Sequence, residues 1–430
     1  MTKRVLIAGE EPTETLIILR LLLRDYHPRD FTVCLWDGSQ WPAEANSPRF
    51  KLVFNHPDVL RRMLRDTKTD LAISEAYIRG NLDVEGDLEA AMPVAYHLMS
   101  RRWPLSARLR VGWKLFRRPV GGRPRPNERQ PARLHGKLHS IERDRQAVTY
   151  HYNVPNDFYA LWLDQRMVYS CAYFETTDEE LDTAQERKLD YLCRKLRLRP
   201  GERLLDMGCG WGGLVIYAAQ RYGVEALGIT LSQNQAMLAN ERIAQAGLQD
   251  RCRVEVRDYR ELNDTKGFDK LVSVGMFEHV GESRLPLYFR HAWQLLRPGG
   301  IFLNHGIAQR ATPRPKGPTF FGRYVFPDGE LVPVSTTLRF AEEAAFEVRD
   351  VESLREHYTL TLRHWARRLE LHRDQASRAV DETTYRIWRL FLHGSAYFFT
   401  LGLLNIYQVL LVKPDAGRSG LPLTRRDWYR

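Results

Sequence analysis

The chain has 430 residues, 43% of them hydrophobic and 27% charged, and this length and balance predict a globular protein with two domains. It lacks an apolar run long enough to span a membrane, and its first residues lack the apolar core and cleavage site of a signal peptide. The five cysteines form no C-x-x-C pair and have no metal-ligand spacing, so we expect no metal site and a cytoplasmic location.

The net charge of +11 is concentrated in one Pro- and Gly-containing segment, residues 101–140. This segment contains 12 of the 64 Lys and Arg residues and one of the 53 Asp and Glu residues, which leaves 52 of each sign elsewhere. Trp103, Trp113 and Phe116 alternate with the basic residues, which favours an anionic membrane surface over nucleic acid as the partner. A solvated linker between domains accounts for the charge equally well.

Residues 1–100 are predicted to form a small N-terminal α+β domain, 101–140 a basic linker and 141–430 a second domain. In the first domain we expect strands at 31–36 and 50–54, with helices at 57–64 and 88–99. The second domain is helical from 141 and then alternates strands with helices from Pro200. Its seven predicted strands lie near 203–207, 224–230, 253–257, 270–274, 301–305, 347–351 and 406–412. Such alternation predicts an α/β fold with a doubly wound, Rossmann-like and mostly parallel sheet.

The run Leu204-Leu-Asp-Met-Gly-Cys-Gly-Trp-Gly-Gly213 reads as a buried strand, a glycine-rich turn and the start of a helix at 214–222. Gly208, Gly210 and Gly212 lack a Cβ, so backbone and ligand can approach closely, and the helix N-terminus points at the turn. This arrangement predicts a site for a nucleoside-containing cofactor at the carboxyl end of a parallel strand. A tight turn with no ligand is the alternative.

The second strand of this domain argues against a dinucleotide enzyme. It ends at Thr230, with Gln235 one helical turn further on, where a dinucleotide fold usually has an acid for the ribose. Residues 232–235 form a predicted capping box that fixes the start of the next helix, and residues 297–300 predict a turn before the fifth strand.

Five motifs resemble, in order, those of cyclopropane-fatty-acyl-phospholipid synthases and mycolic acid cyclopropane synthases, which are S-adenosylmethionine-dependent methyltransferases. They are Tyr169-Ser-Cys-Ala-Tyr-Phe174, the run 204–213, Gly228-Ile-Thr-Leu-Ser-Gln-Asn-Gln235, Gly275-Met-Phe-Glu-His-Val-Gly281 and His305-Gly-Ile307. The resemblance covers about residues 140–413 and implies that 141–430 is a class I methyltransferase catalytic domain. Residues 1–100 look, more weakly, like the small lipid-binding N-terminal domain of bacterial members.

The resemblance implies a set of cofactor-binding residues. Asp258 and Tyr259 would face the adenine, although Asp258 read alone is a turn acid; Tyr169 and Ser170 would approach the amino-acid end, and the Trp211 ring would favour the sulfonium cation. The full set is Tyr169, Ser170, Asp206, Gly208, Cys209, Gly210, Trp211, Gly212, Thr230, Gln235, Asp258 and Tyr259.

The catalytic residues also follow from the resemblance. Methyl transfer to an isolated alkene generates a carbocation, and a base must then remove a proton from the new methyl group while water is excluded. In the relatives a bound bicarbonate is that base. The matching positions here are Glu278, His305 and Tyr358 through their side chains, and Cys171 and Ile307 through backbone N–H groups. We expect Glu278 and His305 to tune each other's pKa. Taken alone, these residues could be a helix-terminal acid, a core histidine and a core tyrosine.

A Pro- and Phe-rich insertion at 308–340 is predicted to form a lid over an acyl tunnel. The expected activity is methyl transfer to the double bond of an unsaturated phospholipid acyl chain at the inner face of the membrane, giving a cyclopropane. A methylene- or methyl-branched product remains open. So do an RNA methyltransferase, which would use the basic segment to grip nucleic acid, and a non-catalytic lipid-binding protein. The relatives imply a possible homodimer.

Overall fold

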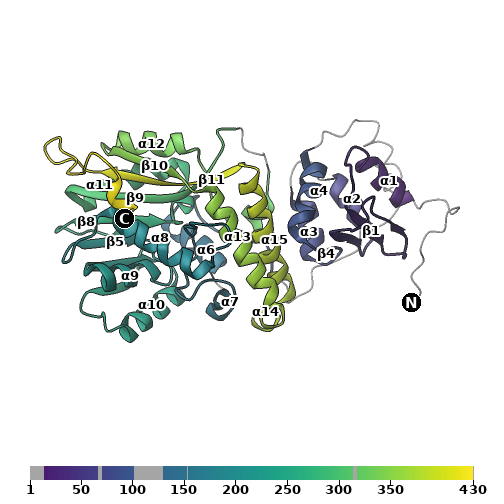
Figure 1. Cartoon of the computed structure of the whole chain (residues 1–430), viewed down its shortest axis with the longest axis horizontal. Helices are drawn as coiled ribbons and strands as arrows, with labels where there is room; N and C mark the ends of the chain where they lie inside the picture. The colour runs from purple at the N-terminus through teal and green to yellow at the C-terminus, as the bar shows by residue number, and fades with distance from the viewer. Residues whose placement is uncertain (1–13, 66–69, 101–128, 153, 313–316, 430) are drawn as a thin grey trace. The chain divides into compact units, whose positions relative to one another are not determined.

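The computed structural model describes residues 14–65, 70–100, 129–152, 154–312 and 317–429 (Figure 1). The chain divides into two compact units. The first consists of Met1–Pro131, Pro313–Val325 and Val380–Tyr397, and the second of Ala132–Thr312, Phe326–Ala379 and Phe398–Arg430. The boundaries differ from the expected ones because residues 313–325 and 380–397, which follow the glycine turn in sequence, cluster with the N-terminal residues.

The first unit contains a small mixed sheet with helices beside it. The sheet has the order β2-β1-β3-β4, in which β1 and β3 are parallel and the other pairs antiparallel. Its elements are α1 (Glu14–Leu22), β1 (Phe31–Leu35), β2 (Gln40–Trp41), β3 (Phe50–Phe54), α2 (Asp58–Arg65), α3 (Leu71–Ile78), β4 (Leu82–Gly86) and α4 (Leu88–Ser100). The strands expected at 31–36 and 50–54 and the helices expected at 57–64 and 88–99 are therefore confirmed.

A later helix completes this unit. α15 (Glu382–Thr400) contributes Arg386, whose guanidinium donates to both carboxylate oxygens of Asp83 and to the carbonyl oxygen of Tyr77. Because Arg386 is buried, these charge-assisted bonds to β4 and α3 fix the helix against the sheet.

The second unit is built on a seven-stranded sheet of order β10-β11-β9-β8-β5-β6-β7. Its strands are β5 (Arg203–Met207), β6 (Glu225–Thr230), β7 (Cys252–Val256), β8 (Phe268–Val274), β9 (Leu296–Gln309), β10 (Glu347–Ser353) and β11 (Leu404–Val412). The five strands from β9 to β7 are parallel, and β11 is antiparallel to both of its neighbours. All seven predicted strands and the doubly wound, mostly parallel sheet are confirmed.

The turn expected at 297–300 is not a separate element. β9 already begins at Leu296, which pairs with Phe268, and Ile301 then pairs with Lys270 after a shift in register. The glycines are therefore absorbed as an irregularity at the start of the strand rather than as a turn before it.

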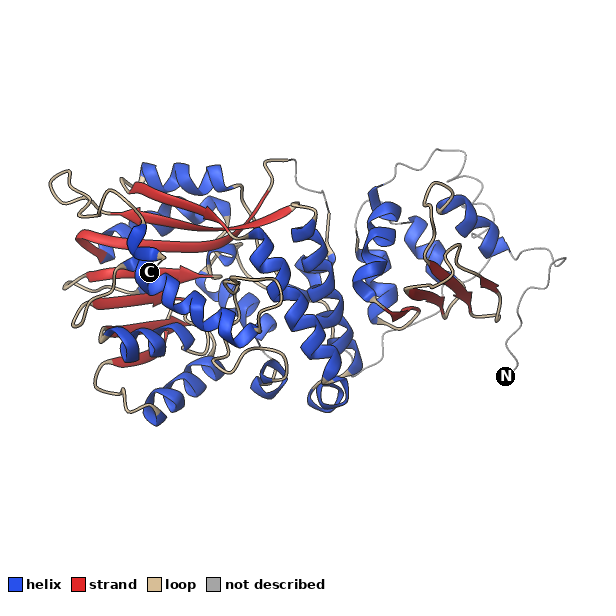
Figure 2. Cartoon of the chain, viewed as in Figure 1, coloured by secondary structure: helices blue, strands red, loops and turns tan. Residues whose placement is uncertain are grey.

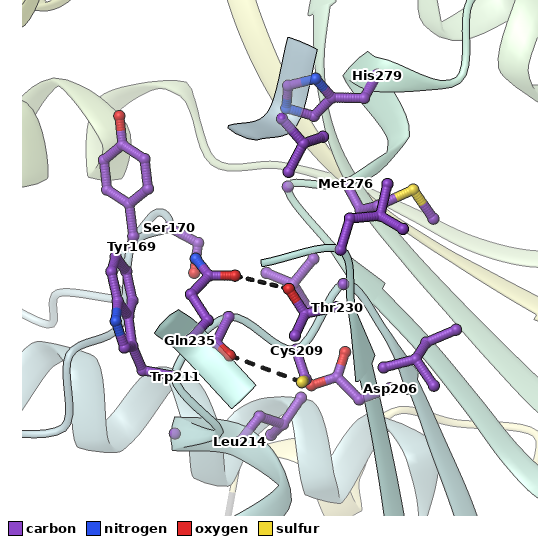
Figure 3. Close-up of a pocket in the computed structure, with 18 of the residues that line it drawn as sticks. Tyr169, Ser170, Asp206, Cys209, Trp211, Leu214, Thr230, Gln235, Met276 and His279 are labelled. Carbon is purple, nitrogen blue, oxygen red and sulfur yellow. Dashed lines mark hydrogen bonds between the residues drawn. The ribbon is translucent and has the colours of Figure 1, made fainter. Parts of the chain in front are cut away.

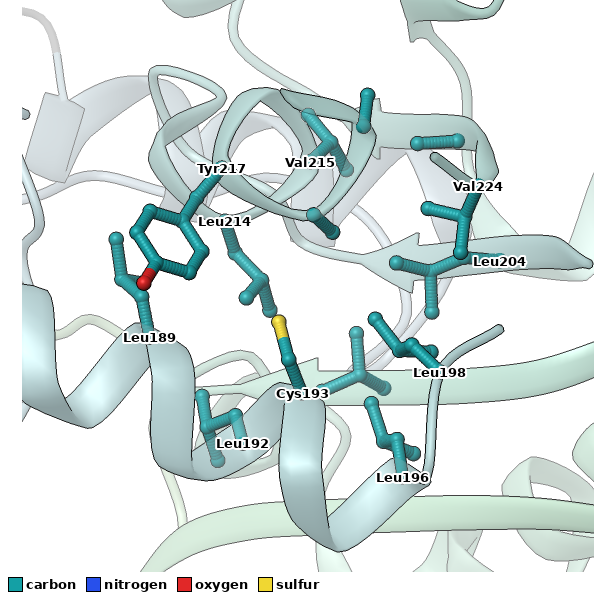
Figure 4. Packing of buried hydrophobic residues seen from close by; sticks show 14 of the residues in the cluster. Leu189, Leu192, Cys193, Leu196, Leu198, Leu204, Leu214, Val215, Tyr217 and Val224 are labelled. Carbon is teal, nitrogen blue, oxygen red and sulfur yellow. The ribbon is translucent and has the colours of Figure 1, made fainter. Parts of the chain in front are cut away.

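Helices cover both faces of this sheet (Figure 2). Leu204 packs among residues of α8 (Leu181–Leu196) and α9 (Gly213–Tyr222), and its neighbour Leu205 packs with α11 (Leu285–Leu295) on the other face. Figure 4 shows the first of these layers, with Leu189 and Cys193 of α8 beside Tyr217 and Leu214 of α9. Since alternate residues of a strand point to opposite faces, β5 needs apolar residues at both positions.

The remaining helices of the second unit are α6 (Ile141–Tyr152), α7 (Asn156–Ala160), α10 (Gln233–Gln245), α12 (Val334–Glu343), α13 (Arg355–Leu371) and α14 (Arg373–Ala379). The chain runs from β5 outward to β6 and β7, then crosses to β8 and β9 on the other side of β5. This reversal is the position at which doubly wound sheets open a crevice at the carboxyl ends of their strands. In the described ranges, no helix is both long enough and apolar enough to cross a membrane.

Candidate active site

A cavity of about 1120 Å³, including the part open to solvent, lies at the carboxyl ends of β5, β6 and β8 (Figure 3). We call it the cofactor cavity. Of the predicted cofactor-binding residues, it is lined by Tyr169, Ser170, Asp206, Gly208, Cys209, Gly210, Trp211, Thr230, Gln235, Asp258 and Tyr259. Gly212 does not line it; this glycine caps α9 in a left-handed conformation, and Gly213 lines the cavity instead. The fold therefore brings eleven of the twelve predicted cofactor-binding residues together around one cavity.

Gly208 shows why the turn after β5 requires glycine. Its φ of +90° lies in the region that side chains disfavour, and a Cβ there would lie 2.5 Å from Cβ of Met276. Met276 follows β8, so the missing side chain allows the ends of β5 and β8 to approach each other beside the cavity.

The end of β6 presents a neutral polar pair. The Thr230 hydroxyl lies 2.7 Å from Oε1 of Gln235, which leaves the Gln235 amide nitrogen available to a ligand. The predicted cap is confirmed in one half, because Oγ of Ser232 accepts from the Gln235 backbone N–H at 3.4 Å. The Gln235 side chain does not return to the Ser232 N–H, which donates to Thr230 instead.

Asp258 is not a surface turn acid, since it is only 2% exposed. Its two carboxylate oxygens accept from the Arg260 side chain at 2.8 and 2.6 Å, and Arg260 also pairs with Asp144 at 3.0 Å. Asp144, Asp258 and Arg260 all line the cofactor cavity. The carboxylate that we expected to face the adenine is thus held by an arginine, and its adenine contact stays a prediction.

The five predicted catalytic residues, Cys171, Glu278, His305, Ile307 and Tyr358, do not line the cofactor cavity. We call them the base cluster. Glu278 lies in the short 3-10 helix η2 (Phe277–His279), and its Oε1 accepts from the Ile307 N–H at 2.7 Å. A Cβ on Gly306 would lie 2.9 Å from Phe277, so this glycine allows η2 to approach β9. The Ile307 N–H, which the resemblance assigned to a bound anion, is therefore engaged by Glu278.

Glu278 and His305 are both buried but have different partners. His305 is fully buried, and its Nδ1 lies 3.2 Å from the Gln408 amide nitrogen. Burial raises the pKa of Glu278 to about 7 and, with the charges of Lys188 and Lys195, lowers the pKa of His305 well below its usual value. The expected mutual tuning is not found, because neither residue is a cause of the other's pKa shift.

Each of these two residues leaves one buried atom unsatisfied. Oε2 of Glu278 and Nε2 of His305 have no hydrogen-bond partner among the described residues. Buried polar atoms without a partner cost free energy, so such atoms point to an absent ligand or water. The donor and acceptor chemistry of the two atoms fits a small oxyanion that carries a proton.

Cys171 and Tyr358 are buried, and their surroundings suit a role in packing and in polar contacts. The Cys171 thiol contacts the Ala172 and Leu354 carbonyl oxygens at 3.3 and 3.8 Å, and burial raises its pKa, so it is no nucleophile. The pKa of Tyr358 is raised chiefly by burial and further by the charges of Cys171 and Glu278.

Aromatic rings connect the cofactor cavity to the base cluster. The Tyr169 ring centre lies 5.3 Å from that of Trp365, which lies 6.0 Å from that of Tyr358. His151 stacks between Tyr169 and Phe326, at 5.8 and 4.2 Å. Aromatic faces favour cations, so this wall suits both a sulfonium and a carbocation.

Among the residues that line the cofactor cavity and that sequence reasoning missed are Tyr152, Lys188 and His279. Figure 3 shows His279 and Met276 across the cavity from Tyr169 and Trp211. Burial lowers the pKa of His279 to about 4, so it is neutral. The position of His279 next to Glu278 in the sequence could have identified it as a site residue. Tyr152 and Lys188 lie in helices with no motif of their own.

The predicted lid and the basic segment are only partly described. Beyond Phe326, the Glu330 N–H donates to the Glu278 carbonyl oxygen at 3.0 Å, so the second half of the insertion docks against η2. The lid role stays a prediction. Residues 101–128 of the basic segment lie outside the described residues.

This sheet, its glycine turn and the cavity at its switch point define a class I S-adenosylmethionine-dependent methyltransferase. More narrowly, the family model for mycolic acid cyclopropane synthetase matches residues 139–409, and the chain belongs to this family. A second model, described as a domain of unknown function, matches residues 18–101.

The chain is 43% identical to a probable fatty acid methyltransferase of Pseudomonas putida over 92% of this chain and 95% of the relative. It is 38% identical to the cyclopropane-fatty-acyl-phospholipid synthase of Escherichia coli over 60% of this chain and 66% of the relative. A solved mycolic acid cyclopropane synthase, complexed with S-adenosylhomocysteine (SAH) and CTAB, superposes with a TM-score of 0.59 and 33% identity, over 62% of this chain and 97% of that one.

Proposed function

We propose that this methyltransferase adds a methyl group to the double bond of an unsaturated phospholipid acyl chain and forms a cyclopropane, with bound bicarbonate as the base. The product is the one in the name of the Escherichia coli relative, and an unsaturated acyl chain is the substrate that such a product requires. The observation that carries the proposal is the pair of buried, unsatisfied atoms, Oε2 of Glu278 and Nε2 of His305, beside an aromatic wall.

S-adenosylmethionine, when bound, supplies an electrophilic methyl group. An alkene that attacks it becomes a carbocation, which water would trap as an alcohol. The rings of Trp365 and Tyr358 are buried and that of Tyr169 is half-buried, and together they supply the apolar, electron-rich surface that such a cation needs. The chain's own part in this step is to orient the acyl chain and to exclude water.

Ring closure requires loss of a proton from the added methyl group. His305 accepts at Nδ1 from the Gln408 amide, so its own proton resides on Nε2, which then donates to an anion. Glu278, with a pKa of about 7, can either donate or accept at Oε2. These two groups would hold a small oxyanion and orient its basic oxygen toward the added methyl group.

A methylene- or methyl-branched product is the second candidate. The Pseudomonas putida relative, which aligns over 92% of this chain, is named a probable fatty acid methyltransferase and not a cyclopropane synthase. The same cation gives a branched product if a hydride shift precedes proton loss, so a small difference in base placement decides between the two.

We also propose that the enzyme works at the inner, anionic membrane surface. A phospholipid substrate requires access to the bilayer, and the basic segment supplies the charge that attracts anionic headgroups. Charge reversal at Arg117, Arg118, Arg123 and Arg125, all outside the described residues, should weaken binding to anionic vesicles in a salt-dependent way. Unchanged vesicle affinity would reduce the segment to a linker.

Lipid analysis of cells that express the chain tests the proposed reaction. We expect unsaturated acyl chains to gain the mass of one CH2 group, with cyclopropane proton signals in the NMR spectrum of the extracted lipids. Methylene signals would favour the second candidate, and unmodified lipids beside methylated RNA would contradict both. Cells that express Glu278→Gln at the same level are the control.

A further inference from the structure

The side chain of Lys188, in α8, lines the cofactor cavity although it is only 1% exposed. Its Nζ donates to Oγ of Ser170 at 2.8 Å. Within the described ranges, no carboxylate forms an ion pair with it. Buried lysines are rare without a paired carboxylate, and an ammonium has three N–H donors, of which Ser170 takes one. The cavity therefore contains a positive charge with unused donors.

Asp206, at the end of β5, is the negative counterpart in the same cavity. It is 2% exposed, and its Oδ1 finds no hydrogen-bond partner in the part of the chain that the structure describes. Burial lowers the pKa of Lys188 to about 8 and raises that of Asp206 to about 7, while each charge partly opposes the shift of the other. Both residues thus stay close enough to influence each other without pairing.

The surroundings hold Lys188 in this position. Gln185, one turn earlier on the same face of α8, donates to the carbonyl oxygens of Val168 and Ser170 at 3.2 and 2.8 Å. Asp164, whose charge also acts on Lys188, is engaged with the backbone N–H groups of Arg166 and Val168. The loop that contains Ser170 is therefore fixed against α8, and Asp164 is not available as an ion-pair partner.

We infer that Lys188 binds the carboxylate of the cofactor's amino-acid end, with Asp206 facing its ammonium group. The amino-acid end of S-adenosylmethionine is a zwitterion, and the separated cation and anion of the cavity match it. Because Lys188 donates to the Ser170 oxygen, the Ser170 hydroxyl proton points elsewhere and is a second donor for the same carboxylate. This inference rests on the cofactor part of the proposed function and not on its lipid part.

The base cluster is the other candidate anion-binding site within reach of this charge. Lys188 acts electrostatically on Cys171 and His305, and it helps to keep His305 neutral. The direct contact of its ammonium, however, is with Ser170, which lines the cofactor cavity, and no member of the base cluster does so. The geometry therefore favours the cofactor carboxylate as the ligand.

Calorimetry with two nucleosides tests the inference without any lipid. SAH contains the amino-acid end, and 5′-methylthioadenosine lacks it. We expect Lys188→Met to weaken SAH binding by about tenfold to a hundredfold, the contribution of a charge-assisted hydrogen bond, and to change methylthioadenosine binding less than about twofold. Lys188→Gln, which keeps a donor for Ser170 but removes the charge, should show the same selective loss and serves if the methionine variant does not fold.

Lys195→Met is the matched control, because Lys195 lies on the same helix, is equally buried and pairs with Glu352 outside the cavity. It should leave the ratio of the two affinities unchanged. A parallel loss of both ligands in Lys188→Met and Lys188→Gln would assign Lys188 a structural role. Unchanged SAH affinity, together with a changed dependence of turnover on bicarbonate, would assign Lys188 to the base cluster. Either result overturns the inference and leaves the lipid reaction to its own test.

Discussion

The cofactor cavity and the base cluster lie beside each other in one unit but are assembled differently. The cavity is formed by the turns that end adjacent parallel strands, so most of its lining comes from short, continuous segments such as 206–211 and 229–231. The base cluster combines a loop residue, a residue of η2, two residues of β9 and one of α13, separated by up to 187 positions from Cys171 to Tyr358.

Their polar groups differ in the same way. The cavity places a cationic side chain, Lys188, near an acidic one, Asp206, and this pair matches a zwitterion, while the cluster contains a carboxyl with a pKa of about 7, Glu278, and a neutral imidazole, His305. We therefore expect the cavity to determine cofactor affinity and the cluster to determine the rate of proton removal. Substitutions should therefore separate the two, and four predictions test that separation.

The largest effect is expected for Glu278→Gln. The amide keeps the acceptor for the Ile307 N–H but cannot share a proton with a bound anion, so turnover should fall by about 10²- to 10⁴-fold. Because Glu278 does not line the cavity, SAH affinity should stay within about twofold. Steady-state kinetics and calorimetry measure the two, and the exposed Glu241→Gln is the control. Loss of SAH affinity would place Glu278 in the cofactor site.

The pH dependence of stability should also reveal Glu278. Its folded-state pKa of about 7 exceeds its ordinary value of 4.5, so the native state retains a proton that the unfolded chain releases. Stability from this group is complete below about pH 4.5 and is lost as the pH rises through 7. Between these limits the free energy of unfolding should fall by up to about 3 kcal/mol more in the wild type than in Glu278→Gln. Parallel urea-unfolding profiles of the two proteins would contradict this.

A smaller effect is expected at the glycine turn. Gly208→Ala combines a φ of +90° with a Cβ 2.5 Å from Met276, whereas Gly247→Ala has a φ of +68° and nothing within 4 Å. Backbone strain should lower the free energy of unfolding of both variants by about 1 kcal/mol or more. Only Gly208→Ala should also weaken SAH binding, by about tenfold or more. Equal SAH affinities of the two variants would show that the close approach does not shape the cavity.

The smallest effect is expected for Cys171→Ser. The thiol is buried with a raised pKa and contacts the carbonyl oxygens of Ala172 and Leu354 and the Thr361 side chain, and a hydroxyl can make the same contacts. Turnover should fall less than about threefold, and thiol reagents should react slowly with this residue in the native enzyme. A loss comparable with that of Glu278→Gln would give the sulfur a chemical role.

The cofactor cavity could be predicted from the sequence, because the residues at each strand end form a local pattern that can be recognised. Alternating glycines after an apolar run predicted the turn at 208, and Thr230 with Gln235 predicted a neutral cofactor contact. Lys188 was not predictable, because a lysine on a helix is normally solvated, and only the fold shows that this face of α8 is covered.

For the base cluster, the sequence supplied candidates but not partners. Glu278, His305 and Tyr358 were named through resemblance, and no local pattern relates them. The expected mutual influence of Glu278 and His305 on their pKa values is not found, because each has another partner. β11 brings Gln408 to His305, and the missing side chain of Gly306 lets Glu278 reach the Ile307 N–H. Such contacts depend on strand order and register, which a single sequence does not contain.

The most direct test of the account uses cofactor with a fully deuterated methyl group and vesicles of an unsaturated phospholipid. If the base cluster removes a proton from the added methyl group, the acyl product of the purified enzyme will retain two of the three deuterons, and Glu278→Gln will form little of it. A product that retains all three, or vesicles that acquire no label, would contradict the central claim that this cluster quenches a carbocation on a lipid chain.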